Sequence, residues 1–395
     1  MNILYLSLLY HPDEKAKISA LSRDGMQNQI DNYQWAFING LRENGQRVDV
    51  LNCLPVGAFP KAYRKVRLPD RCFGASFRQL GCINLPYIKQ KQRARKAERA
   101  MEEWLAADPD NRTLLVYTLY LPYMQAVQAV KRRHPDVRAH VIVTDLPNEF
   151  GISSGRTGLL KRIEYGMGDR RVALCAAFDG FVLLTKYMTE LLPIGDKPTI
   201  VIEGLVSPIA LPAPTAPENA VLYAGTLNRE LGVGVLLEAF EATPDVQLWL
   251  CGRGDMQAEV EAAAKRCANI RYFGFVPQER SLELQANAAA LINPRTGEGL
   301  FTRYSFPSKT LEYMRSGKPV LCCALPGIPD AYRPYLRLLP TEDAQGIRQA
   351  VRELLRMPAE ERERIGRQAR DYVLREKSAA AQCARLVEFL RQSAR

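Results

Sequence analysis

Histidine is scarce in this sequence, and several motifs that would identify a common enzyme class are missing. The 395 residues include three histidines, His11, His134 and His140, whose spacing does not suit a zinc site. The nine cysteines form no Cys-x-x-Cys pair, and several lie in apolar runs, which favours buried thiols in a reducing compartment. No Gly-x-x-x-x-Gly-Lys-Ser/Thr segment occurs, which excludes a P-loop kinase.

Long hydrophobic runs are also missing. No apolar run reaches the roughly 18 residues of a membrane span, and the first residues lack the basic segment of a signal peptide. Residues 1–9 instead predict a buried strand, and we expect a cytoplasmic protein. The segment Gly151-Ile-Ser-Ser-Gly155 matches the hydrolase elbow, but no strand leads directly into it and no histidine follows residue 140. We therefore reject a serine hydrolase.

Positive charge is in excess, with a net charge of +11. It gathers in two segments, Lys61 to Arg67 and Lys89 to Arg99. A solvated surface is slightly favoured for the first segment. For the second, a solvated helix face and contact with an anionic membrane surface or substrate stay equally open. No nucleic-acid-binding motif accompanies the charge, so we expect no nucleic acid as a partner.

The pattern of short apolar runs between helical stretches predicts two α/β domains with doubly wound parallel sheets. Four prolines at positions 208, 212, 214 and 217 interrupt this pattern and indicate a linker. We expect a first domain at 1–206, the linker at 207–218, a second domain at 219–371 and a terminal helix at 372–395. Ligands of such folds bind at the carboxyl ends of the strands, here in a cleft between the domains. The expected strands are 3–8, 48–51, 113–117, 139–143, 180–184 and 199–202, then 221–223, 246–251, 270–273, 289–292 and 319–323.

The segment from Tyr304 to Leu321 predicts a loop, one helix and a turn into a strand. Ser305 and Ser308 are candidate caps and Pro307 a candidate first residue of that helix. A loop that leads into a helix N-terminus presents free N–H groups, which favour a phosphate. Glu312, further along the helix, can accept two hydroxyls of a ribose. The segment therefore predicts a nucleotide site.

Two other loops follow predicted strands of the second domain. Gly225 and Thr226 begin a turn that contains Arg229, and this turn can present N–H groups and a guanidinium to a diphosphate. Gly252-Arg-Gly254 is only part of a dinucleotide fingerprint and indicates tight packing near a nucleotide. In the first domain, Asp145 follows a predicted strand, where we expect a polar group of the site rather than a simple helix cap.

Together these residues resemble the retaining glycosyltransferases of family 4, the group 1 class with the GT-B fold. The resemblance is strongest from Val221 to Leu339, and its most specific part is Ser305-Phe-Pro-Ser-Lys309 with Glu312-Tyr-Met and Ser316-Gly-Lys-Pro-Val320. This loop looks like that of a subset found in surface polysaccharide assembly. The resemblance implies a sugar nucleotide held mainly by the second domain, no cofactor and no metal.

The family pattern has two glutamates eight positions apart, and Glu312 matches the second, which binds the ribose. Tyr304 stands where the first would be. Only Arg229 remains of the usual basic pair near Gly232, with Lys309 as a substitute, and Asp145 aligns with the cleft histidine. The resemblance implies a catalytic set of Asp145, Arg229 and Lys309. The implied donor-binding residues are Gly225, Thr226, Gly252, Ser305, Phe306, Pro307, Ser308 and Glu312.

The sequence thus predicts a metal-independent, retaining glycosyltransferase that uses a nucleoside diphosphate sugar. We expect a glycan or lipid-linked acceptor, and a cytoplasmic or peripheral membrane location through Lys89 to Arg99. Alternatives that remain are an inactive GT-B scaffold subunit, motivated by Tyr304 and the missing basic residue, and an epimerase or phosphorylase of the same fold.

Overall fold

The computed structural model describes residues 1–146, 170–171, 173–216, 218–299 and 301–393. It divides into two units, one formed by Met1–Leu205 with Ala379–Arg395 and the other by Val206–Ser378. The proline-rich residues 207–216 are therefore grouped with the second unit, and the chain returns to the first unit at residue 379. The hydrolase-like segment 151–155 and Pro217 lie outside the described residues.

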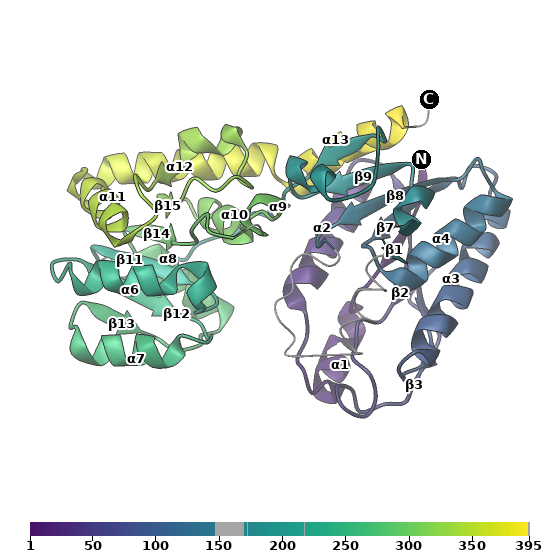
Figure 1. The fold of residues 1–395 in the computed structure, drawn as a ribbon, viewed down its shortest axis with the longest axis horizontal. Coiled ribbons are helices and arrows are strands. Elements are labelled where there is room, and N and C mark those ends of the chain that lie inside the picture. Colours follow the sequence, from purple (N-terminus) through teal and green to yellow (C-terminus); the bar gives the residue numbers. More distant parts are fainter. Residues whose placement is uncertain (147–169, 172, 217, 300, 394–395) are drawn as a thin grey trace. The chain divides into compact units, whose positions relative to one another are not determined.

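Unit 1 is built on a sheet whose strands β1, β2, β7, β8 and β9 are labelled in Figure 1. In the described ladder, β4 is the only strand that pairs antiparallel with its neighbour. The strand order is β10-β9-β8-β7-β1-β2-β5-β4. Mostly apolar strands such as Thr113–Tyr117, buried at every position, are typical of sheets covered on both faces. The bounds are β1 (Asn2–Ser7), β2 (Arg47–Cys53), β4 (Arg71–Cys72), β5 (Phe77–Leu80), β7 (Thr113–Tyr117), β8 (Arg138–Val143), β9 (Gly180–Leu183) and β10 (Thr199–Val201).

Helices cover both faces of this sheet. Alternate residues of β1 point to opposite faces, and Ile3 and Tyr5 pack with α2 and α13. Tyr123 of α4 donates to carbonyls of β1 and β2 on the other face. A small antiparallel pair, β3 (Arg67–Leu68) with β6 (Cys82–Ile83), stands apart. The helices are α1 (Lys15–Leu21), α2 (Asn28–Glu43), α3 (Ile88–Ala107), α4 (Leu121–Arg133) and α13 (Ala379–Gln392), with the short helices η1 (Pro12–Glu14), η2 (Cys175–Ala177) and η3 (Lys186–Glu190).

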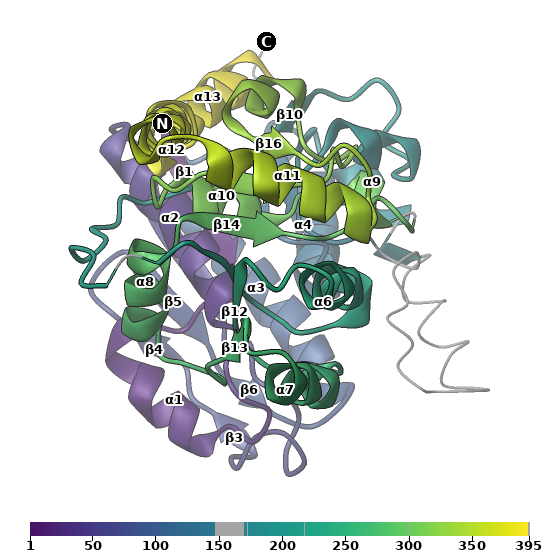
Figure 2. The ribbon, with the colours of Figure 1, turned by 90° about the vertical axis from the view of Figure 1, so that its left-hand side faces the viewer.

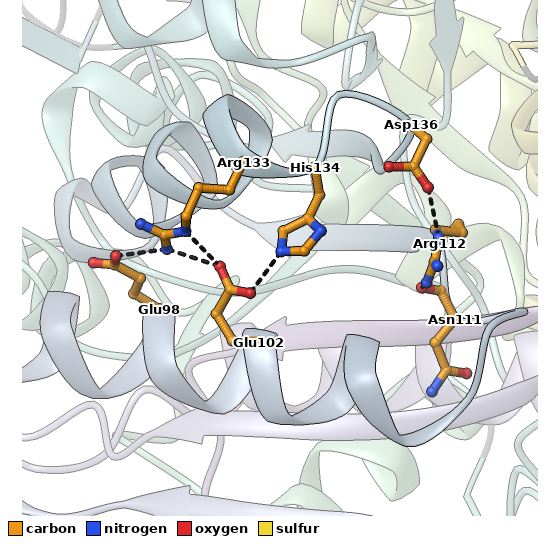
Figure 3. Close-up of polar contacts among 7 residues, drawn as sticks. All are labelled: Glu98, Glu102, Asn111, Arg112, Arg133, His134 and Asp136. Carbon is orange, nitrogen blue, oxygen red and sulfur yellow. Dashed lines mark hydrogen bonds and ion pairs between the residues drawn. The ribbon is translucent and has the colours of Figure 1, made fainter.

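A polar network joins α3 to the end of α4 (Figure 3). Arg133 bridges Glu98 and Glu102 of α3, each at 2.7 Å, and His134 lies 2.7 Å from the other oxygen of Glu102. All of these side chains reach solvent, so the ion pairs themselves add little stability. They fix the register between two helices that pack side by side.

Unit 2 has a fully parallel sheet with the order β13-β12-β11-β14-β15-β16. Its helices lie above and below the strands (Figure 2). The strands are β11 (Ala220–Ala224), β12 (Gln247–Cys251), β13 (Ile270–Tyr272), β14 (Ala290–Asn293), β15 (Val320–Cys322) and β16 (Arg337–Leu338). The helices are α6 (Val233–Glu241), α7 (Gln257–Arg266), α8 (Gln278–Asn287), α9 (Phe301–Tyr304), α10 (Ser308–Met314), α11 (Ala344–Arg356) and α12 (Ala359–Glu376), with η4 (Arg229–Leu231) and η5 (Asp330–Tyr335).

The terminal helix differs from the expectation. The predicted helix from Tyr372 onward is two helices, because α12 ends at Glu376 and α13 begins at Ala379. Residues Leu386, Val387 and Leu390 of α13 are buried against α2 in unit 1. Each such side chain contributes about 1.5–3 kcal/mol relative to exposure. The break at Lys377 and Ser378 separates the two units of the chain.

Candidate functional site

Two glycines at the carboxyl ends of adjacent strands of unit 2 form the centre of the site. Gly225 follows β11 and Gly252 follows β12. Gly252 has φ +141°, and a Cβ there would lie 1.7 Å from the carbonyl oxygen of Gly225. No other residue fits this contact. The two loops therefore approach each other backbone to backbone.

The helix α10 adds charged side chains beside Gly225. Lys309 Nζ lies 2.9 Å from Glu312 Oε2 one turn along the helix, and Lys309 Cε would lie 3.3 Å from a Cβ on Gly225. The buried Tyr313 hydroxyl accepts from the Ala224 N–H at 2.9 Å and donates to its carbonyl at 3.0 Å. This double contact holds α10 against the end of β11. A cation, a carboxylate and a glycine turn are thus brought together.

The position of α10 lies where the strand order reverses. β11 pairs with β12 on one side and with β14 on the other. β13 lies beyond β12, and β15 and β16 lie beyond β14, so the strand order reverses between β11 and β14. In open parallel sheets, ligands bind at the carboxyl edge at such a point. Lys309 also influences the neighbouring Cys251: burial raises the pKa of this thiol to about 11, and the lysine acts in the opposite direction.

The loop before α10 differs from its predicted role. The N-cap residue is Pro307 and the helix begins at Ser308, so the prediction that Ser305 or Ser308 occupies the cap position is wrong. The Ser305 hydroxyl instead accepts from Arg295 Nη2 at 2.7 Å. Phe306 is buried with its ring 5.5 Å from that of Tyr332, and Pro307 is also buried. Among the residues of this loop that were expected to contact the donor, Ser308 is exposed, whereas Phe306 packs in the core and holds the loop in place.

Arg229 and Thr226 lie on the loop after β11. The Arg229 side chain is 69% exposed and lies 3.2 Å from Glu259 of α7. The backbone N–H of Arg229 donates to the Asp255 carboxylate at 3.1 Å. Thr226 is exposed, and its carbonyl accepts from Tyr223 at 2.7 Å. No contact of Arg229 with Lys309 occurs in the described structure. Its catalytic role stays a prediction.

Asp145 belongs to unit 1, two residues after β8. Its side chain reaches solvent, yet the protein around it raises the pKa of the carboxyl group, and a hydrogen bond from Thr144 acts in the opposite direction. The Thr144 hydroxyl also lies 3.5 Å from those of Tyr117 and Thr118. The end of β8 therefore carries several polar groups. The catalytic role of Asp145 stays a prediction.

Three residues that were not predicted lie along the same edge of unit 2. Arg253 stacks on Phe275 at 4.6 Å, and the Phe275 ring is 66% exposed. Arg295, at the end of β14, is buried, and desolvation lowers its pKa to about 10. An arginine three residues after the predicted strand 289–292 was a readable signal. The Arg253–Phe275 stack was not, since it joins two loops more than twenty residues apart.

A cavity of about 620 Å³ lies at the opposite, amino edge of this sheet. Its lining includes Asn219, Ala289 and Pro319, each directly before a strand. The tight glycine contact and the charged pair, rather than cavity volume, distinguish the carboxyl edge as the candidate site.

Comparisons with known proteins bear on the family and on the fold. The model of the family described as "Glycosyl transferases group 1" matches residues 212–372. Three solved structures have a similar fold. A sucrose-phosphate synthase from Thermosynechococcus elongatus is 16% identical over 99% of this chain and 98% of that one, with a TM-score of 0.62. A trehalose-6-phosphate synthase is 10% identical over 99% of each chain, with a TM-score of 0.65, and the catalytic domain of starch synthase IV from Arabidopsis thaliana bound to ADP and acarbose is 11% identical over 99% of each chain, with a TM-score of 0.63.

No curated protein matches the sequence. At these low identities the structural likeness shows the fold, and the family match shows the kind of domain that carries the site. Residues 212–372 therefore match the glycosyl transferases group 1 family, and the chain has the two-domain GT-B fold.

Proposed function

We propose that the protein is a retaining, metal-independent glycosyltransferase that moves a sugar from a nucleoside diphosphate sugar to a glycan or lipid-linked acceptor. The observation that carries the proposal is the Lys309–Glu312 pair beside Gly225, at the switch point of a group 1 domain. A cation for a diphosphate and a carboxylate for a diol then lie about one helical turn apart, as a nucleotide requires.

Lys309 is the main attraction for the diphosphate. α10 has only seven residues, so its dipole adds less than the full charge of the ammonium group. The N–H groups of Gly225 and Gly252 donate to the carbonyls of Cys251 and Gly274. The glycine loops would therefore let the diphosphate approach the main chain closely, and the charge that holds it would come from side chains. Arg229 and the buried cation of Arg295 would add positive charge as the bond to the leaving diphosphate breaks.

Once Lys309 contacts phosphate, Glu312 is free to accept the two ribose hydroxyls. The same carboxylate therefore serves the resting protein as an ion-pair partner and the complex as a diol acceptor. We further propose that the nucleobase stacks on the exposed Phe275 ring. This ring lies after β13, at the same carboxyl edge of the sheet, and a stacked nucleobase would cover its exposed surface.

The leaving phosphate would itself help to deprotonate the acceptor, so no strong base is required. Asp145, at the end of β8, would position the donor sugar or the acceptor hydroxyl. The similar starch synthase domain was bound to ADP, which supports a nucleoside diphosphate here. An acceptor in surface polysaccharide assembly is the most specific reading of the Ser305–Lys309 loop.

Thermal unfolding with UDP, GDP and ADP, each with and without EDTA, tests the nucleotide site. The matching nucleotide should raise the melting temperature by mass action, with no loss in EDTA. No shift with any of the three would contradict the site. A requirement for a divalent cation in transfer would contradict metal independence.

Release of sugar from the donor without acceptor separates an active transferase from a scaffold or an epimerase. A transferase should release free sugar slowly, and the configuration of the first-formed product, read by NMR, should equal that of the donor. A scaffold releases none, and an epimerase changes the donor without releasing its nucleotide.

A further inference from the structure

The basic segment Lys89 to Arg99 does not form a uniformly charged surface. Lys89 and Arg93 are buried, and they donate to the carbonyls of Val56 at 2.8 Å and Leu54 at 2.6 Å. Burial lowers the pKa of Lys89 to about 8. Lys96 pairs with Asp70, and Arg99 with Glu103. A membrane contact through the whole segment, which the sequence left open, is therefore wrong for its two buried cations, Lys89 and Arg93.

What remains of this segment lies on one face at the start of α3. Lys91 and Arg95 are exposed, and neither forms an ion pair within the described residues. They follow Tyr87 at intervals of four residues, so the three side chains share a helix face. The Tyr87 ring is 71% exposed, and Ile88 beside it is 43% exposed.

A second loop lies against this end of the helix. The Val66 carbonyl accepts from the Asn84 N–H at 2.6 Å, and Arg67 pairs with Ile83 across β3 and β6. Val66 is 38% exposed, so three of the five large exposed hydrophobic side chains in the described part of the chain gather here. The same loop supplies four exposed cations with no ion pair among the described residues: Lys61, Arg64, Lys65 and Arg67.

Between the two segments is a cavity of about 610 Å³. Leu68, Pro69, Cys82 and Ile83 supply apolar walls, and Arg67, Arg95 and Lys96 supply cations at its edge. Acidic residues are few nearby: Asp70 is paired with Lys96, and Asp24 approaches Gly57. We call Val66, Tyr87 and Ile88, together with the exposed cations that form no ion pair among the described residues, the basic tip; these cations are Lys61, Arg64, Lys65, Arg67, Lys91 and Arg95.

We propose that the basic tip docks unit 1 on a bilayer that contains anionic lipids, with Tyr87 and Ile88 inserted at the headgroup level. Exposed apolar residues ringed by unpaired cations are what a peripheral anchor presents to an anionic surface. An aromatic ring with a polar end is suited to the interface itself. A free polyanion would satisfy the cations but leave Tyr87, Ile88 and Val66 in water.

Tyr87 supports this choice over a solvated turn. Its φ is +61°, which a residue other than glycine rarely adopts and which carries a conformational cost. The turn holds a large ring outward, where it contributes nothing to the core. The docking does not depend on the transferase activity, and each can fail without the other.

Co-sedimentation with phosphatidylcholine vesicles, with and without phosphatidylglycerol, tests the proposal with the full chain. Binding should require the anionic lipid and weaken with salt. Lys65→Gln with Arg67→Gln should reduce partitioning roughly tenfold or more, and Tyr87→Ser with Ile88→Ser by about tenfold. The matched control Arg132→Gln with Lys186→Gln removes the same charge outside the basic tip and should leave partitioning unchanged.

Insertion has its own readout. In Tyr87→Trp the indole emission should shift to shorter wavelength with anionic vesicles and stay unchanged with neutral ones. Partitioning that the control pair reduces as much as the tip pair would overturn the proposal. So would partitioning that survives the Tyr87 and Ile88 substitutions without an emission shift, which would indicate a polyanion surface instead.

Discussion

Lys309 and Glu312 neutralise each other on α10, with 2.9 Å between Nζ and Oε2 and about a third of each side chain exposed. An exposed pair of this kind adds little to folding. The charges are held beside Gly225 by the buried Tyr313, which fixes the helix to β11. The pair is thus a preformed but replaceable contact: phosphate can take the lysine and a diol can take the carboxylate.

Glu312→Ala should weaken nucleoside diphosphate binding by about 1.5–3 kcal/mol, since hydrogen bonds to a charged group are lost. The melting temperature of the free protein should hardly change. Glu238→Ala, an exposed glutamate on α6, is the matched control and should bind normally. Calorimetry measures both, and equal affinities for the two variants would remove Glu312 from the site.

Lys309→Met should lower kcat for sugar transfer by about a hundredfold or more, because the charge that stabilises the leaving diphosphate is lost. Lys309→Arg keeps the charge and should retain part of the rate. Steady-state kinetics compare the two. A methionine variant as active as the arginine variant would show that the charge does not act on the diphosphate.

Gly252→Ala should lower stability and nucleotide affinity together. The added Cβ meets the Gly225 carbonyl at 1.7 Å, and φ of +141° excludes other residues. We expect at least about 2 kcal/mol of lost stability in urea unfolding, as for other strained or overpacked substitutions. Gly274→Ala, with φ +73° but nothing within 4 Å of the new Cβ, is the control for conformation without the clash and should cost less.

Tyr313→Phe should destabilise unit 2 by about 1–3 kcal/mol. The hydroxyl satisfies both the N–H and the carbonyl of Ala224, and its loss leaves a buried N–H without that partner. Denaturant unfolding measures the change. Tyr335→Phe, whose ring stacks on Tyr372 at 4.3 Å, keeps its packing and should change stability less than Tyr313→Phe.

His140 should make the protein less stable below neutral pH. It is fully buried between Gly180 and Phe389, and neither ring nitrogen has a hydrogen-bond partner among the residues that the structure describes. Burial lowers the pKa of His140 to about 4. The unfolded value is about 6.5. Between these two pKa values the unfolded chain binds the proton and the folded chain does not. The free energy of unfolding therefore decreases as the pH is lowered, by up to about 1.4 kcal/mol per pH unit.

The neighbouring charges that act on His140 are Asp179, Lys131 and Arg138. His140→Leu keeps all three and removes the titrating ring. Unfolding free energies from pH 7 to pH 4 should therefore fall less steeply in the variant than in the parent. Parallel curves for the two proteins would show that His140 does not titrate as its burial requires.

Much of the fold was readable from local pattern. The expected strand 113–117 agrees with β7 to the residue, because apolar periodicity acts over a few positions. The short strand β5 and the edge strand β4 were missed, since pairing rather than periodicity defines them. Glycines after strands also marked the turns of the site, because φ and close approach restrict such positions to glycine.

The sequence alone determined the α/β class, the order of the strands along the chain and the types of residue available for a nucleotide. Only the tertiary structure decided which way each side chain points. Lys89 and Lys91 are two residues apart on α3, yet one is buried and the other exposed; Phe306 packs inward while Ser308, two residues on, is exposed. The physical reason is that burial depends on which elements pack against a residue, and those elements come from distant parts of the chain.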